Sequence, residues 1–258
     1  MKILVLVFCA GLFLLWRCSE SVITPDDSLL VNDFSEIANQ LEYAYQSGLQ
    51  SELDTVFAAW HRNIPPYSSD EINKFSDTIR QVYDIFRAFY SPTDLNRVTA
   101  GAHENFETDF RYIVVQNNLN FAVVDTNPQS YYYRGVTSRE RTIPDFRPQP
   151  NETAFPVVYL SARADSMIYQ YLYQSDRTPK PDHQQRVAFL QEAMQLTHHH
   201  WISDYHKATM PIVSYIYINE KFTEALVTFR VFYQFGQAYL ERSNNKWSLI
   251  HSELTGIE

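Results

Sequence analysis

Cysteine and glycine are scarce in this chain of 258 residues, and both shortages limit what it can be. There are two cysteines, Cys9 and Cys18, and six glycines. Cys9 lies in an apolar N-terminal run that we expect to be removed, so the mature chain has at most one cysteine and no internal disulfide. No Walker, dinucleotide-binding or GxSxG motif is present. Stability must come from burial of apolar surface, which a body of about 240 residues can supply.

Clusters of lysine and arginine are also lacking. The formal net charge is −9, and removal of the signal would take away Lys2 and Arg17 and leave −11. Such a chain is not expected to bind nucleic acid, and its surface gives no electrostatic attraction to anionic lipid. The acidity favours solubility.

The N-terminus has the pattern of an export signal. Lys2 precedes an apolar run from Ile3 to Trp16, which is typical of a secretory signal peptide and too short for a membrane-spanning helix. Cys18, just after the run, stands where a bacterial lipoprotein carries its lipid. The segment resembles the looser lipoprotein signals of Bacteroidota, although Leu15-Trp16-Arg17 departs from the strict small-residue pattern.

We therefore expect a signal peptide over 1–18, a tether over 19–31 and a body over 32–258. The resemblance implies an exported protein on the bacterial cell envelope, held to the membrane by a lipid anchor on Cys18. The alternative is cleavage after Ser21, which would give a soluble periplasmic or secreted protein.

Apolar spacing predicts an α+β fold for the body. Helices are expected first, then mixed structure, then a helix and an antiparallel meander, with boundaries near 32–100, 101–180 and 181–258. Ser68 and Glu71 form a capping box for a third helix that continues to Phe89. The predicted helices are 34–45, 51–60, 68–89, 162–173 and 182–199. The predicted strands are 112–115 and 119–124 (a hairpin), 155–160, 212–218, 222–233, 238–241 and 247–255, with a turn at Gly236.

The C-terminal strands carry a resemblance to a known family. Residues 222–258 end with a polar turn, Lys246-Trp247 and an alternating strand, and they resemble the closing strands of NTF2-like (SnoaL-like, cystatin-like) domains. The resemblance implies a curved sheet that wraps a helix around a cone-shaped pocket. Such domains include both enzymes and binding proteins, so the resemblance does not decide the function.

Histidines form the densest polar cluster, at 198–200, with Asp204 and His206 following. Imidazoles bind divalent metals, and His199, His200 and His206 are the candidate ligands if the chain turns between them. The alternative is a polar helix end, where histidine suits the negative end of the dipole. Apart from this metal, no cofactor is expected.

Asp145 and Arg147 are candidate ligand-binding residues in the irregular segment 125–154. Their side chains could bind a ligand through a charged fork, or they could pair locally or cap an adjacent turn. Tyrosine and phenylalanine are abundant, at 18 and 17 residues. Tyrosines can form a carbohydrate or peptide platform, although they more often fill cores and strands.

These features favour a non-enzymatic binding or interaction role, with an envelope protein or a glycan as partner. The alternative is a secreted enzyme with a pocket, such as a hydrolase, whose metal-dependent form would use the histidines.

Overall fold

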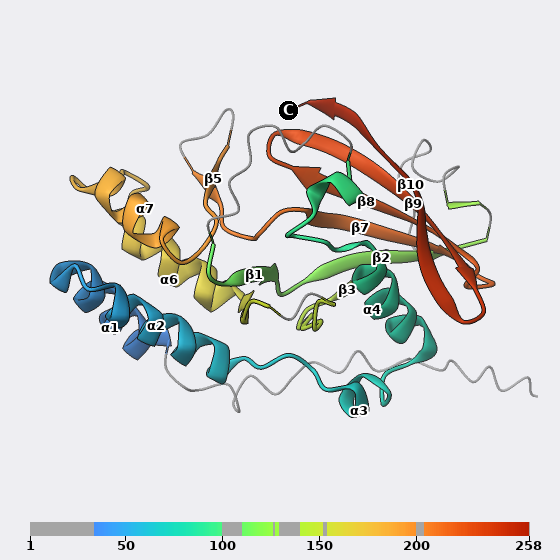
Figure 1. Ribbon diagram of the computed structural model, residues 1–258, viewed down its shortest axis with the longest axis horizontal. Coiled ribbons are helices and arrows are strands. Elements are labelled where there is room, and N and C mark those ends of the chain that lie inside the picture. The colour runs from blue at the N-terminus through green and yellow to red at the C-terminus, as the bar shows by residue number, and fades with distance from the viewer. Residues whose placement is uncertain are drawn as a thin grey trace, which may run out of the picture.

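The computed structural model describes residues 34–99, 110–125, 127–128, 140–151, 154–199 and 204–257, which adopt an α+β fold. Four helices gather at one end of the molecule and a large sheet forms the other end, with α4 against the sheet (Figure 1). The four helices are α1 (Phe34–Ser47), α2 (Gln50–Asn63), α6 (Ala162–Leu172) and α7 (His183–Gln191). Among the described residues, no helix has the length and apolar character needed to cross a membrane.

The helical end is built on the predicted apolar stripes. Ile37, Leu41 and Ala44 of α1 are buried against the stripe of α2, which includes Phe57 and Trp60. A spacing of three and four residues puts such side chains on one face of each helix. Helices predicted at 34–45, 51–60 and 162–173 are thus confirmed within a few residues.

One buried arginine holds α1 against α7. The Arg186 guanidinium donates to both carboxylate oxygens of Glu42, at 2.6 and 2.8 Å, and to Asp182 at 2.8 Å. Its side chain is 7% exposed and also lies over the Tyr45 ring. Hydrogen bonding from Arg186 lowers the pKa of Glu42 from 4.5 to about 2.

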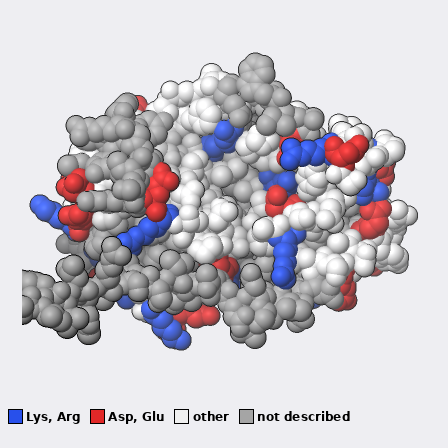
Figure 2. Space-filling model, turned by 180° about the vertical axis from the view of Figure 1, so that it is seen from behind, with Lys and Arg blue, Asp and Glu red and all other residues white. Residues whose placement is uncertain are grey.

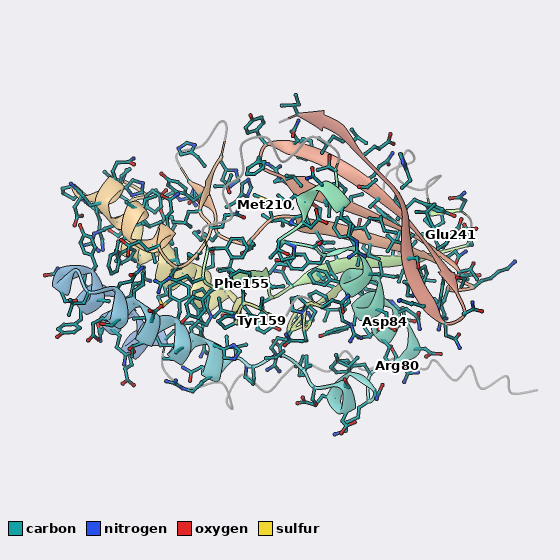
Figure 3. The ribbon with its side chains drawn as sticks, viewed as in Figure 1. Arg80, Asp84, Phe155, Tyr159, Met210 and Glu241 are labelled. Atoms are coloured by element: carbon teal, nitrogen blue, oxygen red, sulfur yellow. The ribbon has the colours of Figure 1, made fainter. Side chains whose placement is uncertain are left out.

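The helix predicted at 68–89 is two helices. The Ser68–Glu71 capping box is present and begins α3 (Ser69–Ile72), but α4 (Asp77–Phe89) has its own N-cap at Ser76. Arg80 of α4, labelled in Figure 3, donates to the carbonyls of Asn73 and Phe75, and so satisfies backbone groups that a continuous helix would pair internally.

The main sheet has the strand order β10-β9-β8-β7-β2-β3. All neighbours are antiparallel except β2 and β7, which are parallel. Phe89 of α4 meets Phe229 of β8, with ring centroids 5.0 Å apart, on the face that carries the sheet core. The strands are β2 (Leu119–Val124), β3 (Glu140–Ile143), β7 (Ile212–Asn219), β8 (Glu224–Val231), β9 (Gln234–Ser243) and β10 (Lys246–Ile257).

A two-stranded parallel ribbon of β1 (Ile113–Gln116) and β4 (Val157–Leu160) separates the two largest hydrophobic cores of the described residues. Successive side chains of a strand point to opposite faces. Val114 and Val158 accordingly join the helical core, while Val115 and Tyr159 join the sheet core. Tyr159, near the centre of Figure 3, accepts the Trp60 indole N–H through its own carbonyl at 3.1 Å.

The predicted hairpin of 112–115 with 119–124 is wrong. β1 pairs with β4, and β2 pairs with β7 and β3. The Gln116 side chain explains the separation, because its amide bonds both the N–H and the C=O of Val213, at 2.9 and 2.6 Å. It thereby directs the chain from the ribbon into the main sheet.

Two other boundaries also differ. The helix predicted at 182–199 ends at Gln191, because the Ala193 carbonyl accepts from the N–H groups of Arg111 and Tyr112 just before β1, at 3.0 Å each. Gly236 lies within β9 and not in a turn. A Cβ there would lie 2.2 Å from the Phe229 ring, so the glycine makes room for that ring. The turn lies at 232–233.

Candidate functional site

A groove lies between the 3-10 helix η2 (Leu95–Arg97) and the first half of β10. Its volume is about 460 Å³. Leu95 and Val98 are buried in the sheet core and hold this wall in place. The Arg97 guanidinium donates to the Ala88 carbonyl at 2.9 Å, near the C-terminal end of α4, while the side chain still lines the groove. The lining residues are Asn96–Thr99 and Lys246–Ser252.

The second wall is the edge of a strand. Seven consecutive residues of β10, from Lys246 to Ser252, line the groove although alternate side chains point to opposite faces of the sheet. The backbone edge itself therefore runs along the groove. Within the described part of the chain, β10 is the last strand on its side of the sheet. Trp247 anchors this edge, because its indole N–H donates to Gln81 of α4 at 2.8 Å in the core.

A β-bulge interrupts the wall. The register between β10 and β9 shifts between Leu249 and His251, and Ile250 is the extra residue. Its side chain is 55% exposed, one of the few large apolar side chains among the described residues to be so exposed. A bulge can protect an edge strand from unwanted pairing, and it also redirects a side chain. Here the bulge places the exposed apolar side chain of Ile250 beside polar residues of the groove.

The groove is basic although the chain is acidic. Arg97, Lys246 and His251 line it, and none of its lining residues carries a carboxylate. Glu253 follows the lining residues in β10, and its carboxylate lies 3.8 Å from His251 and also accepts from Gln237 at 2.6 Å. On the face shown in Figure 2, by contrast, Lys and Arg mostly lie beside Asp and Glu, with uncharged surface between such clusters.

Asp145 and Arg147, the predicted ligand-binding pair, bind each other. Their side chains form an ion pair at 2.9 Å and are 13 and 14% exposed. Asp145 also accepts from Tyr67 at 2.5 Å and Asn117 at 3.1 Å, and Arg147 lies 3.7 Å from the centroid of the Tyr67 ring. Burial and the nearby Asp145 raise the pKa of Tyr67. The network joins three segments of the chain, and a ligand would have to displace Tyr67 or Asn117.

The structure brings together two of the three predicted metal ligands. His199 directly follows β5 (Thr197–His198), and His206 lies in its antiparallel partner β6 (Tyr205–His206), with the two ring centroids 3.5 Å apart and a tilt of 35°. Lone pairs lie in the ring planes, so those of two facing rings run alongside one another and do not converge on one point. The Arg230 guanidinium, 3.4 Å from Nε2 of His206, also disfavours a bound cation.

His200 and Cys18 lie outside the described residues. Within the described ranges, no group of three or more His, Cys, Asp or Glu side chains is arranged to hold a metal ion. Metal binding by His199, His200 and His206 stays a prediction.

Sequence reasoning missed the groove. Lys246 and Trp247 stood out only as part of a family-like turn, and Arg97 carried no signal. Which strand lies at the edge of a sheet depends on the pairing of the other strands, and side-chain periodicity does not reveal it.

Comparisons with known proteins add no relative. No protein-family model matches the chain. No curated protein matches it, and no solved structure does. The NTF2-like resemblance of residues 222–258 therefore stays a prediction.

Proposed function

We propose that this protein is an exported lipoprotein of the bacterial cell envelope, anchored through Cys18, that binds an anionic partner in the groove along β10 and acts without catalysis. The observation that carries the binding role is the groove itself, which is open and has cationic and apolar linings. The export signal and the position of Cys18 in the sequence support the location.

The chemistry of the lining suits binding better than bond cleavage. Arginine and lysine attract carboxylates, sulfates and phosphates, and hydroxyl and amide side chains can orient them. His251 and Ser252 resemble a base and a nucleophile in type, but as neighbours in a strand they point to opposite faces. A hydrolase would need them to lie within hydrogen-bond reach of each other.

The anchor is tested by Cys18→Ala in the native host, with Cys9→Ala as the matched control. We expect the wild type and Cys9→Ala to incorporate radiolabelled palmitate and to fractionate with the membrane, and Cys18→Ala to do neither. A full-length, unacylated wild-type product in the cytoplasm would overturn this part of the proposal.

The groove is tested by isothermal titration of the processed full-length protein, in detergent, with polyglutamate and with polygalacturonate. We expect at least one of these polyanions to bind. Arg97→Glu combined with Lys246→Glu should weaken binding at least tenfold, because both cations of the groove change sign. Arg62→Glu combined with Lys74→Glu, which reverses two exposed charges elsewhere, is the matched control. Equal loss in both double variants would contradict binding at the groove.

A further inference from the structure

We infer that the anionic partner of the groove is an extended acidic peptide that adds to β10 as a further strand of the sheet. This inference rests on the proposed function and names the partner's class. Its first basis is the edge: Lys246–Ser252 spans about 20 Å at roughly 3.3 Å per residue, enough for a peptide of about six residues. An edge strand presents unpaired N–H and C=O groups to such a peptide.

The second basis is the order of side chains along β10. Lys246 and Ser248 pair in register with Ser243 and Glu241, on the outer face of the sheet, and His251 returns to that face after the bulge. Trp247 and Leu249 lie on the inner face, against the sheet core. A strand added here would place alternate side chains beside the cations and the remainder beside apolar groups.

Charge complementarity selects an acidic sequence for the outer positions. Arg97 adds a cation from the opposite wall, and no carboxylate lines the groove. A second copy of this chain would bring the same cations and the same net negative charge against themselves. The favoured occupant is therefore a peptide with acidic and apolar residues in alternation, and not another β10.

The test uses the acetylated, amidated hexapeptide Glu-Val-Glu-Val-Glu-Val and the processed full-length protein. We expect it to bind, and we expect the Lys-Val-Lys-Val-Lys-Val analogue to bind at least tenfold more weakly. The block sequence Glu-Glu-Glu-Val-Val-Val keeps the composition but loses the alternation, so it should also bind more weakly. Arg97→Glu combined with Lys246→Glu should weaken binding of the alternating peptide at least tenfold.

Backbone pairing is tested by N-methylation of the peptide on its three Glu or on its three Val. Amides of alternate residues point to the same side of a strand, so we expect one methylated peptide to bind as well as the parent and the other at least tenfold more weakly. Amide hydrogen exchange of residues 246–252 should slow on peptide binding.

The outcomes separate the two proposals. If both methylated peptides bind alike, or if only polygalacturonate binds, strand addition is overturned and the proposed function stands. If neither polyanion nor the peptide binds, both are overturned. A dimer in light scattering that the peptide dissociates would show that a second copy occupies the edge, and this also overturns the inference.

Discussion

Replacement of Arg186 by methionine is expected to destabilise the helical end of the molecule. The arginine is 7% exposed and is the cation shared by Glu42 and Asp182. Methionine fills much of the same volume but leaves two carboxylates facing each other. Loss of one partner of a buried ion pair costs roughly 3 to 5 kcal/mol, and since both carboxylates are more than a third exposed and rehydrate, we expect about 2 to 3 kcal/mol.

The same network predicts a pH dependence. Arg186 lowers the pKa of Glu42 to about 2 in the folded protein, below the 4.5 of an unperturbed carboxyl. The folded state therefore binds the proton less readily, and the stabilisation is present above pH 4.5 and is lost as the pH falls toward 2. The full shift corresponds to roughly 3 kcal/mol. Because the Glu42 side chain is 38% exposed, solvent screening should reduce this to about 1 kcal/mol.

Urea unfolding followed by circular dichroism measures both effects. Arg186→Met should lower the free energy of unfolding at pH 7, while Lys74→Met, at an exposed helix-flanking position, should leave it almost unchanged. Glu42→Gln should lower it less than Arg186→Met and should flatten the decline between pH 5 and 2.5. The reasoning is refuted if Arg186→Met unfolds within about 0.5 kcal/mol of the wild type, the size of an ordinary surface substitution.

Three further substitutions test local packing, each by urea unfolding. Gly236→Ala should cost about 2 kcal/mol or more, since the new Cβ meets the Phe229 ring at 2.2 Å; an unchanged midpoint would contradict this contact. Ser68→Ala should cost about 1 kcal/mol through loss of its capping box, and Ser68→Thr, which keeps the hydroxyl, should restore most of it. Trp247→Phe should cost about 1 to 3 kcal/mol because it leaves the Gln81 amide oxygen unpaired in the core, and adding Gln81→Leu should recover part of that loss.

Local patterns in the sequence predicted the helices well. The apolar stripes of α1, α2 and α6 and the capping box at Ser68 each depend on residues that are close together in the sequence, and the structure confirms them. The break at 73–76 was missed because the apolar spacing continues from Ile72 to Ile79 across it. An α+β fold was also predicted and is present.

These local patterns do not predict which strands pair or which distant residues come together. The strands predicted at 112–115 and 119–124 lie close to β1 and β2, but the side-chain bonds of Gln116 to Val213 separate them. The groove depends in the same way on distant partners, since Arg97 and Lys246 are separated by 149 positions and meet only after the sheet is assembled. Asp145 and Arg147 were predicted to bind a ligand, with local pairing as the alternative; the structure shows the pair, and the contact of Asp145 with Tyr67 depends on the fold.

The ribbon of β1 and β4 has a consequence for how the molecule melts. Alternate side chains of the ribbon belong to the two different cores. Unfolding of the helices would therefore expose Val114 and Val158, and unfolding of the sheet would expose Val115 and Tyr159. Deletion of either half of the molecule would leave one face of the ribbon without its apolar packing partners. Calorimetry should therefore record a single heat-absorption peak, with equal van't Hoff and calorimetric enthalpies.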